Sequence, residues 1–153
     1  MENRDHQVRA AVAGDVPCVA AVTDAAYRHY IDRIGLTPAP MEADHAADVA
    51  ARRVYVTGRP PAGVVVLVEE AGYLLLASIA VRPDAQGTGT GRALLGFAER
   101  RARELGLPEV RLYTHALMWE NQALYERIGY ALIGRRVDGP YDRLYYRKPV
   151  GPG

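Results

Sequence analysis

The sequence predicts one mixed α/β domain, and three observations lead to this prediction. The chain has 153 residues, which fits a single domain of the usual ~100–200 residues. Hydrophobic residues make up 49% of it and charged residues 24%, as in a soluble globular protein rather than a disordered chain. Helical and β-type segments follow in the order β, α, α, β, β, β, α, β, α, β, β, without repeats or low-complexity linkers. We therefore expect residues 1–153 to form one domain.

The amino-terminal half is predicted to contain a strand, two helices and an antiparallel meander. Residues 6–12 alternate loosely before a turn at Gly14 and Asp15, as a strand does. Apolar residues then recur at helical spacing as far as Tyr30, with Asp15 as the expected N-cap. A loop rich in glycine and proline leads to a short helix at 41–51. Three strand-like runs separated by turn residues follow at 53–57, 64–69 and 73–81.

The carboxy-terminal half is predicted to alternate helices and strands. Residues 92–105 place Leu94, Leu95 and Ala98 on one face and charged side chains on the other, which is typical of an amphipathic helix ended by Gly106. The remaining expected elements are a strand at 110–114, a helix at 121–128, and strands at 130–137 and 143–148 joined by a hairpin turn.

The composition excludes several classes of protein. A net charge of +1 argues against nucleic acid as a partner, because such binders carry a strong basic excess. The apolar runs fall far short of the ~20 residues of a membrane span. The amino terminus lacks the apolar core of a secretory signal, so we expect a cytoplasmic protein. The single cysteine, Cys18, excludes an intrachain disulfide and a thiolate metal cluster, and we expect no metal.

The segment that carries most chemical information lies between the expected strand at 73–81 and the helix that follows it. Gly87, Gly89 and Gly91 alternate there, and glycines allow bare amides to converge on an anion at the positive end of a helix. The segment predicts a cradle for a phosphate or pyrophosphate. It is no P-loop, because arginine and alanine follow Gly91 where lysine and serine or threonine are needed, and it fits a dinucleotide fingerprint poorly. The alternative is a turn that only connects strand and helix.

Two motifs resemble those of a known family. Residues 86–91, Gln-Gly-Thr-Gly-Thr-Gly, resemble the acyl-CoA-binding signature Gln/Arg-x-x-Gly-x-Gly/Ala of the GNAT superfamily of N-acetyltransferases. Residues 121–130, Asn-Gln-Ala-Leu-Tyr-Glu-Arg-Ile-Gly-Tyr, are similar to its second signature. The resemblance covers almost the whole chain and implies the GNAT acyl-CoA N-acyltransferase fold, a mixed, mostly antiparallel sheet of about seven strands flanked by about four helices. Residues 34–41 and 135–143 resemble a bacterial subgroup of the family, which gives no substrate.

The resemblance implies an enzyme that moves an acetyl group from acetyl-CoA to a primary amine by direct attack in a ternary complex. Backbone groups of the strand end would hold the pantetheine arm, and amides of the turn and helix start would hold the pyrophosphate. Gln86 would stabilise the turn, and Asn121 would act as an N-cap that also touches the pantetheine. The expected cofactor-binding residues are Ile79, Ala80, Val81, Gln86, Gly87, Thr88, Gly89, Gly91, Arg92 and Asn121.

Tyr125 is the residue expected to act in the chemistry, because the matching tyrosine of many family members protonates the departing CoA thiolate. A tyrosine that only packs on its helix is the alternative. Many relatives carry a glutamate as general base on the fourth strand, and residues 73–81 contain none. We expect His115 in this role rather than Glu69 or Glu70, because the ordinary pKa values are ~6.5 and ~4.3. Relay through water to a neutral amine would need no base.

The acceptor is expected to be a small-molecule or peptide amine. We expect Tyr30, Arg33, Met41 and Tyr141 to bind it and to line one cleft with His115, facing Tyr125. Glu120 and Asp142 are candidates for holding a cationic amine. The family also accommodates a homodimer. A different class of function, a noncatalytic acyl-CoA-binding sensor, would need no tyrosine hydroxyl at position 125.

Overall fold

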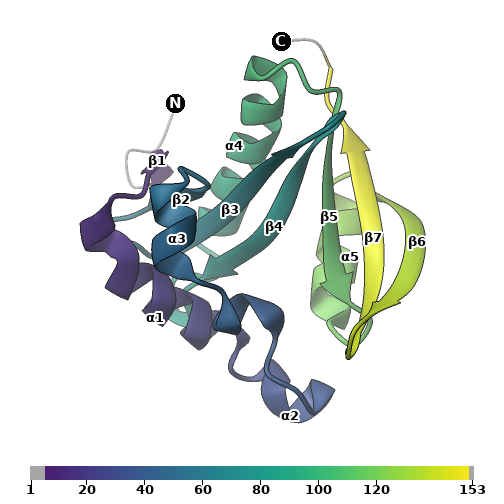
Figure 1. The fold of residues 1–153 in the computed structure, drawn as a ribbon, viewed down its shortest axis with the longest axis horizontal. Coiled ribbons are helices and arrows are strands. Elements are labelled where there is room, and N and C mark those ends of the chain that lie inside the picture. Colours follow the sequence, from purple (N-terminus) through teal and green to yellow (C-terminus); the bar gives the residue numbers. More distant parts are fainter. Residues whose placement is uncertain (1–5, 152–153) are drawn as a thin grey trace. The chain divides into compact units, whose positions relative to one another are not determined.

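The computed structural model describes residues 6–151. Its elements are, in order, β1 (Val8–Ala10), η2 (Ala13–Asp15), α1 (Val16–Tyr27), α2 (Tyr30–Ile34), η3 (Ala39–Glu42), α3 (His45–Ala50), β2 (Val54–Thr57), β3 (Gly63–Glu70), β4 (Tyr73–Val81), η4 (Pro83–Ala85), α4 (Thr90–Glu104), β5 (Glu109–His115), α5 (Trp119–Arg127), β6 (Ala131–Asp138) and β7 (Tyr141–Pro149) (Figure 1). Every strand expected from the sequence is present, as is each expected helix in at least part of its length.

The strands form a seven-stranded mixed sheet in the order β1-β2-β3-β4-β5-β7-β6. β4 and β5 are parallel, whereas β1 with β2, β2 with β3, β5 with β7 and β6 with β7 are antiparallel. The expected fold class, a mostly antiparallel mixed sheet with flanking helices, is therefore confirmed.

The described chain divides into two compact units. The first unit contains residues 6–67 and 78–97, and the second contains residues 68–77 and 98–151. The single domain expected from the sequence stays a prediction.

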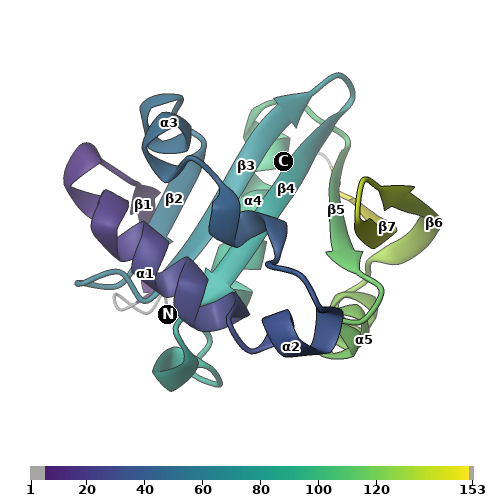
Figure 2. The same cartoon turned by 60° about the horizontal axis from the view of Figure 1, so that its bottom comes forward.

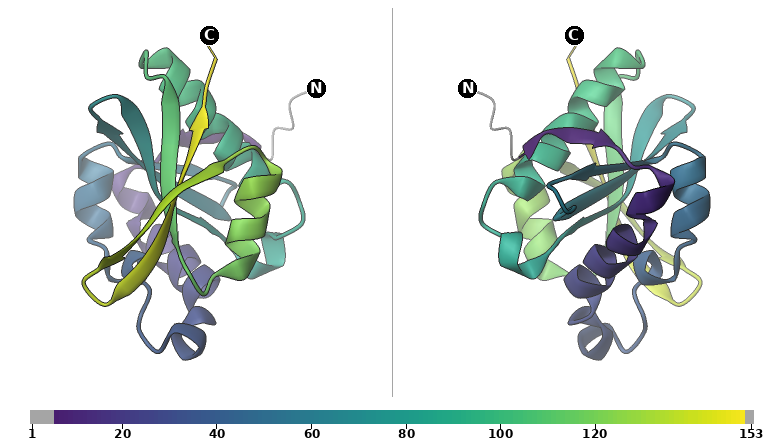
Figure 3. Two further views of the ribbon diagram at one scale, coloured as in Figure 1. Left: turned by 90° about the vertical axis from the view of Figure 1, so that its right-hand side faces the viewer. Right: turned by 90° about the vertical axis from the view of Figure 1, so that its left-hand side faces the viewer.

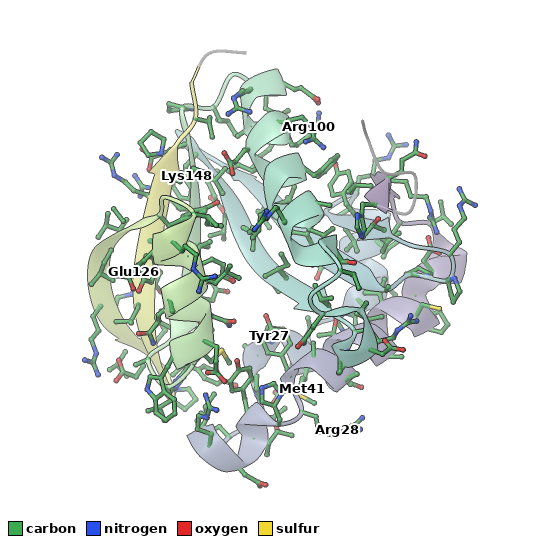
Figure 4. The ribbon with its side chains drawn as sticks, turned by 180° about the vertical axis from the view of Figure 1, so that it is seen from behind. Tyr27, Arg28, Met41, Arg100, Glu126 and Lys148 are labelled. Atoms are coloured by element: carbon green, nitrogen blue, oxygen red, sulfur yellow. The ribbon has the colours of Figure 1, made fainter. Side chains whose placement is uncertain are left out.

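In the first unit, α1 contacts α3 and η3, and it lies close to β1 and β2 (Figure 2). Val19 and Val22 of α1 are buried, as are Val56 of β2 and Val65 of β3. Figure 4 shows Arg28 at the end of α1 directed away from Tyr27, which is buried. Helical spacing therefore directs one side of α1 into an aliphatic core, as the sequence predicts.

Gly63, the first residue of β3, lets α4 pack very closely on this strand. A Cβ atom at this position would come within 2.6 Å of Thr90 Cγ2 and 2.9 Å of Leu94 Cδ1. Distances this short are overlaps, so an added side chain would displace the side chains of Thr90 and Leu94 or the first turns of α4. The absence of a side chain at Gly63 thus determines where α4 begins relative to β3.

In the second unit, the hairpin of β6 and β7 lies beside β5 (Figure 3). Val110, Leu112 and Thr114 of β5 are buried, while the alternate residues of the strand are mostly half-exposed. Tyr146 of β7 is opposite Leu112 in the register, and its ring centroid lies 6.3 Å from that of Tyr125 on α5. One face of the β5–β7 pair is therefore covered by α5, and the other face carries the alternate side chains.

Three element boundaries differ from expectation for local reasons. The first strand is shorter than expected, because the Val12 amide donates to Asp15 Oδ2 at 2.8 Å instead of continuing the sheet. The Asp15 carboxylate also accepts from Arg9. Asp15 therefore occupies the N-cap position of α1 without forming a side-chain cap bond. The helix expected to run as far as Tyr30 is split into α1 and α2. The helix expected at 41–51 begins later as α3, where Asp44 Oδ1 accepts from the Ala47 amide at 3.0 Å.

We predict that Gly63→Ala lowers the free energy of unfolding by about 1–3 kcal/mol, because the added methyl group overlaps α4. Urea unfolding monitored by circular dichroism would measure the loss. Gly14→Ala is the matched control, since a Cβ atom there would meet nothing within 4 Å. Equal stability of the two variants would contradict the close packing of α4 on β3.

Candidate active site

The glycine turn of the first unit is shaped by two residues in the left-handed region. Gly87 has a φ of +80° and Gly89 a φ of +91°, backbone angles that other residues rarely adopt. Gly91 lies inside α4, and a Cβ atom there would make an ordinary contact with Val81 Cγ2 at 3.6 Å. The backbone conformation of the turn therefore requires glycine at positions 87 and 89. At position 91, only the packing against Val81 favours a small residue.

The turn is held by hydrogen bonds that leave its amides available. Gln86 Nε2 donates to the Val81 carbonyl at 3.4 Å, and Thr88 Oγ1 donates to the Ala85 carbonyl at 2.5 Å. Thr88 Oγ1 also lies 2.9 Å from Thr90 Oγ1, which joins the turn to the first residue of α4. Among residues 6–151, no acceptor is found for the amides of Gly87, Gly89, Gly91 and Arg92. Free amides at the start of a helix attract an anion.

A hollow with a volume of about 570 Å³ borders the turn within the first unit. Thr88 and Thr90 of the turn line it, together with other residues that include the positively charged Arg9, Arg59 and Arg82. Arg9 and Arg82 form ion pairs with Asp15 at 2.7 Å and with Asp84 at 2.5 Å. The Arg9 guanidinium lowers the pKa of the Asp15 carboxyl, with further help from the Val12 amide. The surroundings of the turn thus carry positive charge suited to phosphate groups.

The end of β4 is held by a contact that the sequence did not indicate. Tyr27 Oη donates to the carbonyl of Ile79 at 2.8 Å, which ties α1 to the strand end. The register between β4 and β5 covers only Leu74–Leu76 and Val110–Leu112, so Ile79, Ala80 and Val81 lie beyond it. No local pattern in the sequence around Tyr27 indicates a contact with this distant carbonyl.

The second signature lies on α5, but the expected role of Asn121 as N-cap is wrong. The helix begins at Trp119, with Met118 at the N-cap position, so Asn121 is the third helical residue. The Met118 carbonyl accepts from the Asn121 amide at 3.1 Å, and Gln122 Nε2 donates to the Ala116 carbonyl at 2.8 Å. These bonds start the helix one turn earlier than an Asn cap would.

Tyr125 faces the interior of the second unit. Only 4% of its surface is exposed, and its ring lies 5.9 Å from that of Tyr130 in an edge-on arrangement. The hydroxyl of Tyr130 is buried without a partner among the described residues, and burial raises the pKa of this phenol strongly. The aromatic cluster therefore fixes the ring of Tyr125 while keeping its surroundings poor in water.

His115 ends β5 on the face opposite α5, and its hydrogen bond determines its tautomer. Its Nδ1 atom accepts from the Leu117 amide at 3.1 Å, so the neutral ring carries its proton on Nε2. Burial lowers the pKa of this imidazole; Asp142 opposes that shift and Arg143 adds to it. A ring with Nδ1 occupied and Nε2 protonated has no lone pair for a substrate proton. This geometry argues against His115 as general base and favours the relay through water.

The other expected bases and acceptor residues are spread over both units. Glu69 and Glu70 are exposed at the end of β3. In the first unit, the Arg33 guanidinium lies 5.2 Å from the ring centroid of Tyr30, and Met41 lies on η3, which contacts α1. In the second unit, Tyr141 begins β7, next to Arg143, whose guanidinium lies 5.1 Å from its ring. Because the expected cleft combines residues of both units, it stays a prediction.

The comparisons with known proteins agree with this geometry. A family model described as an acetyltransferase (GNAT) domain matches residues 49–132, more than half of the chain. The solved structure of a PaiA N-acetyltransferase from Thermoplasma acidophilum in complex with coenzyme A is similar over 94% of this chain and 98% of that chain, with a TM-score of 0.78 and 16% identity, which shows the fold. A mixed sheet with a glycine turn at the start of a helix is thus the framework of an acyltransferase. The chain belongs to the GNAT family of acetyltransferases.

Two curated bacterial proteins are also similar, and both are named mycothiol acetyltransferase. The one from Propionibacterium freudenreichii subsp. shermanii is 28% identical over 140 residues, which cover 80% of this chain and 42% of that protein. The one from Pseudarthrobacter chlorophenolicus is 30% identical over 129 residues, which cover 72% of this chain and 37% of that protein. The chain therefore spans less than half the length of these relatives. Within residues 6–151, no helix is long and apolar enough to cross a membrane.

We predict that the imidazole of His115 titrates below the ordinary ~6.5, with its neutral form protonated at Nε2. Asp142→Asn should lower this pKa further, since the carboxylate favours the charged ring, and Arg143→Gln should raise it. Nitrogen-detected NMR titration would measure both the pKa and the tautomer. Arg100→Gln, an exposed change on α4, is the control that should leave the pKa unchanged. A neutral ring protonated at Nδ1 would restore His115 as a candidate base.

Proposed function

We propose that the chain transfers an acetyl group from acetyl-CoA to a primary amine. The observation that carries this proposal is the glycine turn at the start of α4, where the amides of Gly87, Gly89, Gly91 and Arg92 have no acceptor in the described chain. Membership of the GNAT family makes acetyl-CoA the expected donor and an amine the acceptor. The residues fit this donor, because free amides and nearby arginines suit its phosphates.

The strand end and α5 supply the remaining donor contacts in this proposal. Ile79, Ala80 and Val81 lie beyond the β4–β5 register, which suits backbone hydrogen bonding to an extended pantetheine arm. Tyr27 fixes this strand end through the Ile79 carbonyl. Asn121, in the first turn of α5, is the additional side chain proposed to touch the arm.

The reaction forms a C–N bond and breaks a C–S bond. The amine attacks the thioester carbonyl and loses a proton to water, and Tyr125 donates a proton to the departing sulfur and regains one from water. In this proposal His115 acts as a hydrogen-bond donor through its Nε2 proton rather than as the base, because its Nδ1 atom already accepts from the Leu117 amide. The atoms balance, since the products are an amide and the free thiol of CoA.

The acceptor is proposed to lie against Tyr30, Arg33, Met41 and Tyr141. Arg33 is stacked on Tyr30, and the loop between α2 and η3 is held by Pro38, which is buried. A wall of this kind would be ordered before the amine binds, which lowers the entropic cost of positioning it.

We predict that Gly87→Val weakens CoA binding at least tenfold, because valine strains the left-handed turn and moves its amides. Isothermal titration calorimetry with CoA would measure the dissociation constant. Gly106→Val is a matched control at the other end of α4, with a φ of +73° and open space around it, so it carries the same strain away from the turn. Equal CoA affinity of the two variants, or no binding by the unchanged protein at millimolar CoA, would contradict the proposed donor site.

We predict that Tyr125→Phe lowers kcat about 100-fold and leaves the affinity for CoA unchanged, as expected for loss of a general acid. Thiol release with a broad panel of amines would measure turnover, and calorimetry would measure CoA binding. Tyr130→Phe is the control, since it removes a neighbouring buried hydroxyl that has no partner in the described residues. A protein that binds CoA but acetylates no amine would favour the noncatalytic sensor.

A further inference from the structure

A second hollow, with a volume of about 570 Å³, lies entirely within the second unit. Its side chains of interest are three tyrosines and three arginines from β4, β5, β6 and β7: Tyr73, Arg111, Tyr113, Arg136, Arg143 and Tyr145. We refer to it as the Arg–Tyr hollow. No role described so far uses Arg111 or Arg136.

The strand register explains why these side chains meet. Tyr113 is opposite Tyr145, and His115 is opposite Arg143, in the β5–β7 pair. Arg143 is in turn opposite Arg136 in the β6–β7 pair. Directly opposed residues point to the same face of a sheet, so these side chains and His115 share one face. Gly134, opposite Tyr145, adds no side chain and leaves the hollow open.

This face carries more positive than negative charge. Glu109 forms ion pairs with Arg111 at 2.6 Å and with Arg147 at 3.1 Å. Asp138 forms ion pairs with Arg136 at 2.6 Å and with Arg143 at 3.4 Å. Each carboxylate is thus shared by two guanidinium groups. Four arginines against two carboxylates leave a surplus of positive charge on this face, and Arg111, Arg136 and Arg143 of this group line the hollow, where they attract an anion.

Three of the arginines are stacked on the faces of tyrosine rings, which fixes the positions of their guanidinium groups. The Arg111 guanidinium lies 4.3 Å from the ring centroid of Tyr73, that of Arg143 lies 4.4 Å from Tyr113, and that of Arg136 lies 4.7 Å from Tyr145. Stacking leaves the N–H groups at the rim of a guanidinium able to form hydrogen bonds. Arg136 uses its Nε for Asp138 and its Nη2 for Tyr145 Oη, so a further partner would bind at Nη1. The edge of a planar, oriented guanidinium matches a carboxylate or a phosphate.

The ion pairs of Asp138 and Asp142 make this face unsuited to a cationic ligand. Asp138 is engaged by Arg136 and Arg143. Asp142, which was expected to hold a cationic amine, forms two hydrogen bonds with Arg135, at 2.9 and 2.6 Å. Both carboxylates of this hairpin are therefore neutralised by arginine.

The position of the hollow relates it to the chemistry proposed above. Tyr125 lies on the α5 side of the β5–β7 pair, whereas the Arg–Tyr hollow lies on the opposite side of the same strands. In acyl transfer, the amine adds to one face of the planar thioester carbonyl, and the sulfur leaves from the tetrahedral carbon that this addition forms. An acceptor held on the hollow side of β5 would keep its acidic group apart from the Tyr125 hydroxyl.

We propose that the Arg–Tyr hollow binds the acidic group, a carboxylate or a phosphate, of the amine acceptor. This inference rests on the proposed acetyltransferase function and names the class of its acceptor. Arg111 and His115 lie four residues apart on one strand, which corresponds to about 13 Å, while Arg143 is directly opposite His115 at about 5 Å. These backbone spacings favour an acceptor whose acidic group is separated from its amine by several bonds.

Matched pairs of acceptors test this inference with the full-length chain. Each pair contains one acidic amine and its neutral counterpart: β-alanine with β-alaninamide for the carboxylate, and glucosamine 6-phosphate with glucosamine for the phosphate. Thiol release gives kcat/KM for each compound. We expect the acidic member of at least one pair to be preferred tenfold or more, and the pair that shows the preference identifies the acidic group.

Arg136→Gln is the informative variant, because Arg136 is not among the groups that shift the pKa of His115. It should raise KM for the acidic acceptor about tenfold and bring the preference close to one, and Arg136→Lys should restore only part of it. Arg100→Gln, the same change of charge on the exposed side of α4 (Figure 4), should leave the preference unchanged. Thermal unfolding of each variant distinguishes loss of the site from loss of the fold, and Arg111→Gln replaces Arg136→Gln if the latter unfolds.

The outcomes separate this inference from the proposed function. Binding of CoA with acetylation of neutral and acidic amines alike, unchanged in Arg136→Gln, would overturn the Arg–Tyr hollow and leave the acetyltransferase intact. Failure to bind CoA would overturn the acetyltransferase instead. In that case calorimetry with β-alanine and glucosamine 6-phosphate decides the site alone, since binding lost in Arg136→Gln supports it and absence of binding refutes it.

Discussion

Close packing of α4 on β3 at Gly63 is the constraint on which the anion-binding geometry of the first unit depends. Because no side chain separates the strand from Thr90 and Leu94, the first turns of α4 lie directly against β3. The hydroxyl of Thr90 lies next to that of Thr88, which in turn donates to the Ala85 carbonyl. The position of the helix is thereby transmitted to the turn, and the free amides keep a defined direction without any bound ligand.

In the second unit, strand register and charge act together. Along one face of β5 and of β7, arginine and tyrosine occupy alternate positions. Antiparallel pairing places the side chains of β5 opposite those of β7 on this face. Burial lowers the pKa of His115, and Arg143 adds to this shift against the opposing effect of Asp142. A positive environment that attracts an acid and disfavours protonation of nearby nitrogen suits an amine that must react in its neutral form.

The roles of single residues depended on contacts more than on residue type. His115 has a suitable ordinary pKa for a base, yet the Leu117 amide occupies the nitrogen that would accept the proton. Asn121 is a favourable N-cap residue, yet the Met118 carbonyl starts the helix before it. Tyr27 looks like a core residue, and its hydroxyl instead holds the Ile79 carbonyl at the end of β4.

The sequence by itself determined the order of the elements, the mixed sheet and the glycine turn, because apolar periodicity and positive φ angles are local properties of the chain. The tripeptide Arg-Leu-Tyr occurs at both 111–113 and 143–145 and was a signal for the Arg–Tyr hollow, but its meaning depends on register. Only the tertiary structure decided that Tyr113 faces Tyr145, that Arg143 faces Arg136, and that the nearby carboxylates are already paired. A shift of one residue in register would send these side chains to the other face, and no local pattern specifies that register.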